Sequence, residues 1–222
     1  MRVFLFSILL LQSIQIFGQS NIVRSYNYNA SNRQKPLIVY FSGDGGFNTF
    51  SNALCENLAK SGYEVFAVNS NAYFKKKKTP AETASFLEVN VRKLLKEREH
   101  SNIVLLGYSF GADVMPFIYN NASALTVQAT TKIILLAPSP TTDFEIHLLD
   151  MLNMNGTYNM DVAAEINKIK TIPLHIVTGS KAEFPSFKIK NKNALITIVN
   201  GNTHFNKNPE AILPIIYKAL SK

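Results

Sequence analysis

The chain has 222 residues, a formal net charge of +8 and a single cysteine, Cys55. This length supports one sizeable hydrophobic core, so we expect a single domain over residues 21–222, and the absence of a fixed-period repeat excludes solenoid architectures. One thiol excludes an intramolecular disulfide framework, and the helical spacing of Cys55 with neighbouring leucines predicts that it is buried.

The first twenty residues, "MRVFLFSILLLQSIQIFGQS", have the pattern of a secretory signal. Arg2 precedes an apolar run from Val3 to Leu11, and small or polar residues follow at Gly18–Ser20. A membrane-spanning helix needs about 20 continuous apolar residues, and Gln12 interrupts this run early. We therefore expect residues 1–20 to be cleaved and the mature protein to be periplasmic or secreted. An exported basic protein meets anionic lipid or cell-wall polymers more readily than nucleic acid, so no nucleic-acid partner is expected.

Six short apolar runs, rich in β-branched and aromatic residues, recur along the rest of the chain. Their near-continuous apolarity is typical of strands that are buried on both faces of a mostly parallel sheet. The predicted strands are Leu37–Phe41, Glu64–Val68, Ile103–Leu106, Ile133–Leu136, Leu174–Val177 and Leu195–Val199.

Stretches with helical spacing lie between these runs. Alternating strands and helices predict an α/β fold with right-handed crossovers, in which functional sites lie at the carboxyl ends of the strands. Threonine or asparagine before proline fits a helix N-cap, and glycine fits a helix end. The predicted helices are Phe50–Leu58 before Gly62, Ala84–Leu95 after Thr79-Pro80, and Ala211–Leu220 after Asn208-Pro209. The long segment Ser139–Lys170 is expected to be irregular or short-helical.

A glycine-serine-glycine pattern follows the third predicted strand, in Gly107-Tyr108-Ser109-Phe110-Gly111. A serine hydroxyl is a poor nucleophile unless it is held exposed beside a base. A sharp turn from strand to helix holds it so, and the flanking small residues allow that turn. Ser109 is therefore the predicted nucleophile of a serine hydrolase. An ordinary strand-to-helix turn is the alternative.

A glycine-rich loop, Ser42–Phe47, follows the first predicted strand. In a hydrolase such a loop supplies one backbone N–H to the oxyanion hole, and the residue after the nucleophile supplies the other. This assigns the N–H groups of Asp44 and Phe110, while the Asp44 side chain is expected to stabilise the turn. A phosphate-binding loop is less consistent with the sequence because no Gly-Lys-Ser/Thr follows.

Among the four histidines, His204 is the predicted general base because it follows the last predicted strand. His100 ends a charged helix and is expected to be solvated. His175 lies within a strand and is expected in the core. His147 lies in the long segment and is a candidate for substrate contact.

The acid that orients the base is less well defined by the sequence. Glu183 is the carboxylate that follows the strand before the one leading to His204, and the chain order serine, acid, histidine favours it. Asp143 is the rival, and Glu145 lies two residues later. Either Glu183 or Asp143 would hold the His204 tautomer.

Four consecutive lysines follow the second predicted strand, so we expect them near the mouth of the site. A charge run is usually a solvated face, but lysines near a membrane also contribute about 1 kcal/mol each towards anionic lipid. Substrate or membrane contact is thus an expectation for each of the four, which are Lys75, Lys76, Lys77 and Lys78. No cluster of histidine, cysteine and carboxylates has metal-ligand spacing, so neither a metal nor another cofactor is expected.

The segments "YFSGDGGF", "YFKKKKTPAETASFL", "GYSFGADVMPFIYN", "DFEIH" and "THF" resemble successive blocks of the bacterial virulence protein VirJ family, which includes AcvB-type proteins. The resemblance covers about Pro36 to Phe205. It implies an exported α/β-hydrolase domain with Ser109 as nucleophile and His204 as base. Two departures are Phe47, where the family usually has tryptophan, and Glu183, which comes one residue later than the usual acid.

The resemblance also implies a substrate. Members of the family hydrolyse aminoacylated phosphatidylglycerol, releasing lysine or alanine, and some are linked to virulence and type IV secretion. The leading hypothesis is an exported hydrolase of carboxylic esters, with an aminoacyl lipid as substrate. Because the lysine run Lys75–Lys78 would repel a lysyl group, we expect an alanyl or other neutral acyl group to suit the site better. The alternative is a non-catalytic accessory that binds secretion-system proteins.

Overall fold

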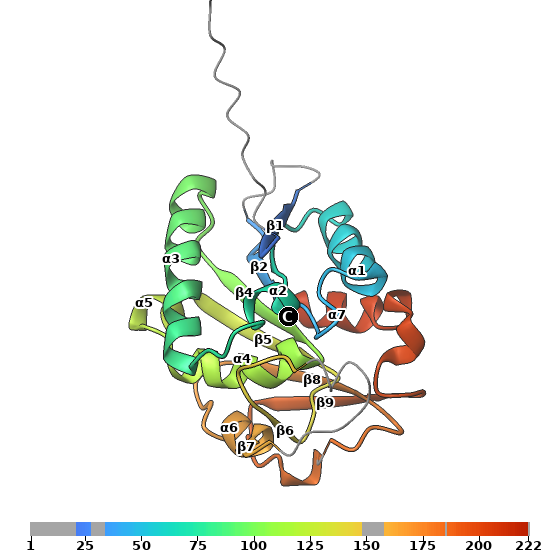
Figure 1. Ribbon diagram of the computed structural model, residues 1–222. Helices are drawn as coiled ribbons and strands as arrows, with labels where there is room; N and C mark the ends of the chain where they lie inside the picture. The colour runs from blue at the N-terminus through green and yellow to red at the C-terminus, as the bar shows by residue number, and fades with distance from the viewer. Residues whose placement is uncertain (1–20, 28–33, 148–157, 185, 222) are drawn as a thin grey trace, which may run out of the picture.

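The computed structural model describes residues 21–27, 34–147, 158–184 and 186–221 (Figure 1). The predicted signal sequence at residues 1–20 lies outside the described residues. Within the described ranges, no helix is both long and apolar enough to cross a lipid bilayer.

A seven-stranded sheet forms the centre of the molecule, in the order β1-β3-β2-β4-β5-β8-β9 (Figure 1). Every neighbouring pair is parallel except β1 and β3, which are antiparallel. The six predicted strands are therefore confirmed, and β1 is an edge strand that the sequence did not reveal. The strands span Val23–Tyr26 (β1), Leu37–Phe41 (β2), Val65–Val68 (β3), Ile103–Tyr108 (β4), Thr130–Leu136 (β5), Leu174–Gly179 (β8) and Ala194–Val199 (β9).

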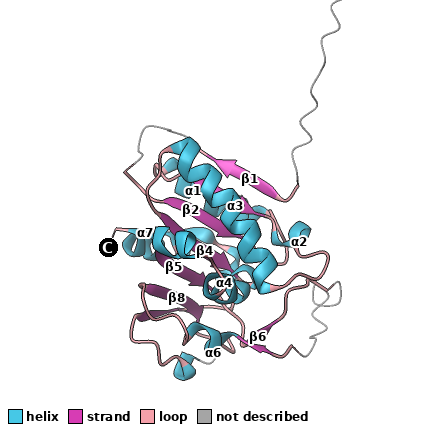
Figure 2. Cartoon of the chain, turned by 90° about the vertical axis from the view of Figure 1, so that its left-hand side faces the viewer, coloured by secondary structure: helices cyan, strands magenta, loops and turns pink. Residues whose placement is uncertain are grey.

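Helices cover both faces of this sheet (Figures 1 and 2). One face packs against α3, α4 and α6, and the other packs against α1 and α7. Burial on both faces explains why the central strands are apolar without alternation. The helices span Thr49–Lys60 (α1), Ser70–Tyr73 (α2), Pro80–Arg98 (α3), Phe110–Asn120 (α4), Ala124–Ala129 (α5), Val162–Ile166 (α6) and Leu213–Leu220 (α7). Short 3₁₀ turns lie at Ser186–Lys188, Phe205–Lys207 and Pro209–Ala211.

Two of the predicted helix ends follow the capping residues of the sequence, whereas Asn208-Pro209 opens a 3₁₀ turn and α7 begins only at Leu213. Thr79 caps α3 in a capping box, in which its hydroxyl accepts from the Glu82 N–H and the Glu82 carboxylate accepts from the Thr79 N–H. Gly62 follows the end of α1 with φ of +83°, a conformation that glycine adopts without strain. Cys55 is fully buried, as its spacing predicts.

The prediction that His100 is solvated is wrong. Its side chain is buried, with Nδ1 3.1 Å from the Lys35 carbonyl oxygen and Nε2 3.1 Å from Glu64 Oε2. The buried carboxylate of Glu64 needs a polar partner, and His100 supplies one. The charged helix before His100 gave no sign of this long-range contact.

The long segment Ser139–Lys170 contains little regular structure, as expected. It forms a two-stranded ribbon of β6 (Thr141–Thr142) and β7 (Met160–Asp161), followed by α6. Residues 148–157 of this segment lie outside the described residues.

Candidate active site

Ser109 lies at a sharp turn between β4 and α4. Its backbone has φ of 50° and ψ of −121°, which is a strained conformation for a residue with a side chain. It occupies the N-cap of α4, yet its side chain makes no capping hydrogen bond. The turn therefore presents the hydroxyl at the carboxyl end of the sheet instead of using it to stabilise the helix.

The glycines on either side of Ser109 are required by close backbone packing. A Cβ atom on Gly107 would lie 2.4 Å from the Gly111 carbonyl oxygen. A Cβ atom on Gly111 would lie 2.2 Å from the carbonyl oxygen of Phe41 at the end of β2. Both distances are too short for any side chain, so the glycines set how closely α4 packs against β2 and β4.

The glycine-rich loop approaches Ser109 directly. A Cβ atom on Gly43 would lie 3.2 Å from Cβ of Ser109. The Asn71 side chain donates to the Asp44 carbonyl oxygen at 2.7 Å, and Asp44 Oδ1 accepts from the Gly45 N–H at 2.9 Å. These bonds fix the loop, and the second confirms that the Asp44 side chain stabilises the turn.

The two predicted oxyanion donors have no protein acceptor among the described residues. Neither the N–H of Asp44 nor that of Phe110 is hydrogen-bonded there. Phe110 is the first residue of α4, where backbone N–H groups lack a partner within the helix. Both donors are thus available to a substrate oxygen beside Ser109.

A cavity of about 350 Å³ opens beside Ser109. Its lining includes Asp44, Phe110 and both rival acids, Glu183 and Asp143, so the structure brings these predicted residues together. Two further carboxylates also line it, from Asp113 and Glu145, and no lysine or arginine does so among the described residues. The cavity therefore has a strongly negative lining.

Asp113 is a site residue that the sequence analysis missed. It lies one helical turn after Ser109 and is only 4% exposed. Its Oδ1 accepts from the Ser139 N–H at 2.5 Å, which ties α4 to the loop after β5. Burial raises the pKa of this carboxyl from its ordinary 3.8 to about 7, and the nearby Asp44 adds to the rise. The sequence feature that could have identified Asp113 as a site residue is that it is the lone carboxylate in the apolar sequence of α4.

The raised pKa of Asp113 predicts a pH-dependent stability. Between pH 4 and 7 the folded state holds a proton on Asp113 that the unfolded state has lost, so this group favours folding less as the pH rises. We expect Asp113→Asn to remove this slope and to raise the free energy of unfolding at pH 8 by on the order of 2 kcal/mol. Urea denaturation at pH 5 and pH 8 measures the effect. A variant that is less stable than wild type at pH 8 would contradict it.

The two rival acids have different surroundings. Asp143 Oδ2 lies 2.9 Å from Nε2 of His147, whose ring stacks against Tyr158 with centroids 5.8 Å apart. Glu183 is exposed at the cavity lining, and no hydrogen bond to its carboxylate is formed within the described residues. Asp143 is thus paired with a histidine other than His204, whereas Glu183 has its carboxylate available.

His204 is close to the serine turn but is not hydrogen-bonded to it. Its exposed ring makes an edge contact with the ring of Tyr108, the residue before Ser109, with centroids 6.3 Å apart. Within the described residues, no hydrogen bond joins its imidazole to Ser109, Glu183 or Asp143, and it does not line the cavity. The structure therefore assembles the serine, the backbone donors and the acids, with His204 beside them.

Residues 35–222 match the family described as bacterial virulence protein (VirJ). The match covers most of the chain. The chain belongs to the VirJ family. A search of curated proteins found no match.

Solved structures extend the comparison to the fold of this VirJ-family chain. MenH from S. aureus has a TM-score of 0.65 at 13% identity, covering 90% of this chain and 99% of MenH. The esterase EaEST from Exiguobacterium antarcticum has a TM-score of 0.63 at 13% identity, covering 90% and 95%. Est1E from Butyrivibrio proteoclasticus has a TM-score of 0.60 at 15% identity, covering 90% and 94%. The chain has the α/β-hydrolase fold, which confirms the predicted fold class.

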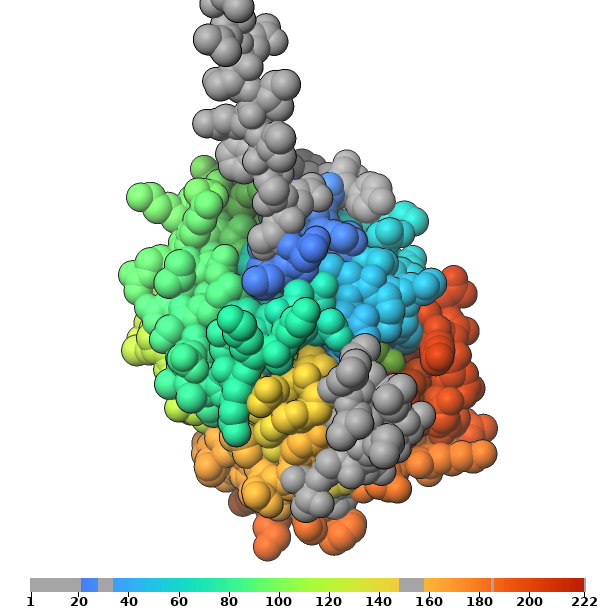
Figure 3. Space-filling model, in the orientation of Figure 1, coloured from blue at the N-terminus to red at the C-terminus, as the bar shows by residue number. Residues whose placement is uncertain are grey.

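The lysine run of this VirJ-family chain lies outside the cavity, although the sequence placed it near the mouth of the site. The residues that line the cavity include none of Lys75, Lys76, Lys77 and Lys78. The Lys78 N–H donates to the Phe144 carbonyl oxygen at 2.8 Å, so the run lies next to the segment of residues 140–147, and the two segments are neighbours on the surface (Figure 3).

The side chains of the lysine run are mostly exposed to solvent. Lys75, Lys76 and Lys77 are exposed. Lys78 is half-buried, with Nζ 5.5 Å from the centre of the Tyr73 ring. None of the four lines the cavity, so contact of the run with a bound acyl group is not observed and stays a prediction. Contact with a membrane stays a prediction for all four.

Proposed function

We propose that the protein is a serine hydrolase that cleaves carboxylic esters in two steps. The observation that carries the proposal is the turn at Ser109, where positive φ, two obligatory glycines and an uncapped hydroxyl occur together at the mouth of a cavity. A binding protein has no need for a strained serine at this point, because strain is maintained where function requires it.

In the first step, Ser109 Oγ attacks the acyl carbon while its proton moves to His204. The N–H groups of Asp44 and Phe110 bind the developing oxyanion. The protonated His204 then donates to the leaving alkoxide, and an acyl-serine ester remains. In the second step, water attacks this ester with His204 as base, and the carboxylic acid leaves. Glu183 is the proposed orienting acid, since the carboxylate of Asp143 already binds His147.

The position of His204 is compatible with this mechanism. Hydrogen bonds of catalytic groups are often long without substrate and shorten when the reacting complex forms. The His204 backbone N–H is held by Asn202 Oδ1 at 3.1 Å, while the ring is exposed next to Tyr108. Rotation of the side chain is therefore not blocked by burial.

We further propose that the acyl group carries a positive charge, as in an aminoacyl ester. The carboxylates of Asp143, Glu145 and Glu183 line the cavity together with Asp44, and a cationic ammonium group would balance their charge. This reverses the expectation, based on the lysine run, that an alanyl or other neutral acyl group suits the site. An alanyl ester belongs to the cationic class, because its α-amino group is largely protonated near neutral pH. Aminoacylated phosphatidylglycerol is the proposed natural substrate, met by an exported protein at an anionic membrane.

Comparing substrates that differ only in the charge of the acyl group tests this specificity. We expect lysyl and alanyl esters to have kcat/KM values at least about tenfold above that of an uncharged acyl ester of similar size, because one charge-assisted contact contributes about 1.5–3 kcal/mol. Glu145→Gln should reduce this preference, whereas Glu56→Gln, on α1 and outside the cavity, should not. Equal rates for charged and uncharged acyl groups would contradict the proposed substrate class.

One observation favours a second candidate, a non-catalytic accessory that binds secretion-system proteins. In the described residues the imidazole of His204 makes no hydrogen bond, so a complete catalytic triad is not formed. A chromogenic ester distinguishes the candidates. A serine hydrolase turns the ester over, with a burst of alcohol stoichiometric with the chain when deacylation is slower than acylation, and an accessory protein releases no alcohol above the uncatalysed rate.

A further inference from the structure

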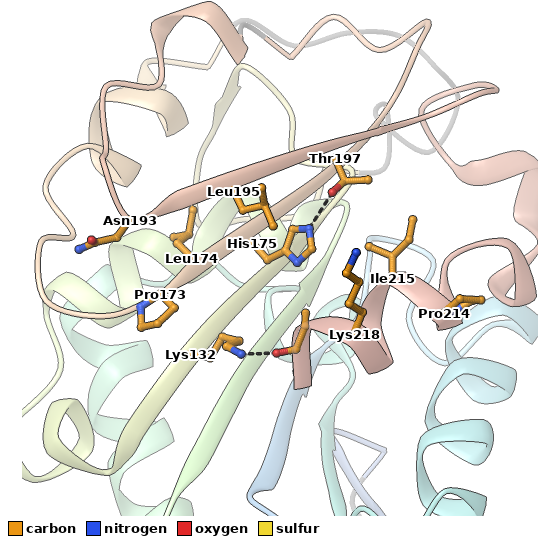
Figure 4. Close-up of a pocket in the computed structure, with 11 residues that line it drawn as sticks. Lys132, Pro173, Leu174, His175, Asn193, Leu195, Thr197, Pro214, Ile215 and Lys218 are labelled. Atoms are coloured by element: carbon orange, nitrogen blue, oxygen red, sulfur yellow. Dashed lines mark hydrogen bonds between the residues drawn. The ribbon is translucent and has the colours of Figure 1, made fainter. Parts of the chain in front are cut away.

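A second cavity, of about 390 Å³, lies at the opposite end of the sheet from Ser109. It is bounded by the amino-terminal ends of β8 and β9 on one side and by α7 on the other (Figure 4). We call it the α7 groove, and its lining includes Lys132, His175, Leu195, Thr197, Ile215 and Lys218.

The α7 groove exists because α7 covers the sheet incompletely. Ile216 of α7 is buried, but the neighbouring Ile215 is only partly buried and lines the groove. On β9, the last strand of the sheet, Leu195 points into the groove and is still 55% exposed. Ile198 lies three residues later, on the other face of the strand, and does not line the groove. The apolar wall is thus left open to a ligand.

The charged side chains that line the α7 groove are both positive. Lys132 and Lys218 contribute ammonium groups, and no carboxylate lines the groove among the described residues. Lys132 donates to the Ala219 carbonyl oxygen at the end of α7. Lys218 extends towards His175 (Figure 4), and its ammonium makes no hydrogen bond or ion pair with any described residue.

His175 adds a polar group on the floor of the α7 groove. Its side chain is buried, and its Nε2 lies 2.8 Å from Thr197 Oγ1 (Figure 4). Thr197 belongs to β9 and His175 to β8, so their contact is held by the paired strands. Apolar walls with a few convergent polar groups are typical of small-molecule sites.

We propose that the α7 groove binds a single-chain anionic amphiphile, of the chemical class of a long-chain fatty acid. The alkyl chain would pack against Leu195 and Ile215, and the carboxylate would pair with Lys218 beside His175. Charge complementarity selects this class, because the groove joins an apolar wall to two cations and, among the described residues, to no anion. This site goes beyond the proposed hydrolase, since it lies away from Ser109.

Calorimetric titration of the mature protein with sodium dodecanoate, below its micelle concentration, tests the proposal. We expect one dodecanoate per chain with a Kd below about 1 mM, and at least about tenfold weaker binding of dodecyltrimethylammonium. Leu195→Glu should weaken dodecanoate binding at least about tenfold, and so should Lys218→Gln, because each removes a favourable contact with the ligand. Ile198→Glu is the matched control, an equally exposed position on β9 that faces away from the groove, and should keep the wild-type affinity.

Three outcomes would overturn the proposal: no binding of dodecanoate, equal binding of the cationic amphiphile, or equal loss in Leu195→Glu and Ile198→Glu. Binding of phosphatidylglycerol vesicles without binding of monomeric dodecanoate would also overturn it, in favour of a membrane-contact surface. Ser109→Ala should bind dodecanoate like the wild type, so failure of the hydrolase proposal and failure of this one are distinguishable.

Discussion

We expect Ser109→Ala to lower kcat for ester hydrolysis by at least about 10³-fold, because it removes the proposed nucleophile. Alanine keeps the Cβ atom, and the serine hydroxyl makes no capping hydrogen bond, so the turn should persist. The free energy of unfolding should then change by less than about 0.5 kcal/mol. Steady-state kinetics and urea denaturation of the same preparation measure both quantities.

Ser139→Ala is the matched control for the nucleophile. Ser139 also lines the cavity, and the N–H that it donates to Asp113 belongs to the backbone, which alanine retains. We expect its kcat to fall by less than about tenfold, as for the loss of one neutral hydrogen bond. Similar losses in the two variants would mean that Ser109 has no special role.

Gly111→Ala should be strongly destabilising. Its new Cβ would lie 2.2 Å from the Phe41 carbonyl oxygen, and this acceptor belongs to a central strand that has no room to move. We expect a loss of about 3 kcal/mol or more in the free energy of unfolding, together with loss of hydrolysis as α4 shifts away from β2. Chemical denaturation and the yield of folded protein measure the first effect.

Gly62→Ala is a control in which the new side chain causes backbone strain but no clash with the backbone. Gly62 has φ of +83°, but the nearest atom to its added Cβ is Lys35 Nζ at 3.4 Å, the end of a flexible side chain. We expect a loss of about 1–2 kcal/mol from strain alone, with hydrolysis retained. If Gly111→Ala were no less stable than Gly62→Ala and remained active, the account of the tight serine turn would be wrong.

The fold was largely predictable because its signals are local. Buried parallel strands produce apolar runs, and caps such as Thr79 mark helix ends directly. The missed strand β1 shows the limit. Two of its four residues are exposed and it pairs at the edge of the sheet, so its sequence, VRSY, lacks the pattern of a buried strand.

The site was less predictable because it depends on contacts between distant segments. The turn at Ser109 follows from adjacent residues, and the structure has the expected geometry there. Asp113, by contrast, acquires its environment from a loop 26 residues later in the chain. The pairing of Asp143 with His147 rather than His204 likewise depends on how the long segment folds back, which no local pattern reports.

Labelling with a fluorophosphonate probe, mapped by mass spectrometry, tests the central claim most directly. We predict covalent labelling of the wild type at Ser109, loss of labelling in Ser109→Ala and His204→Ala, and retention in His147→Ala, since His147 is the other histidine near the site. Absence of labelling in the folded wild type, or labelling that persists without Ser109, would contradict the account and favour a binding role for the turn.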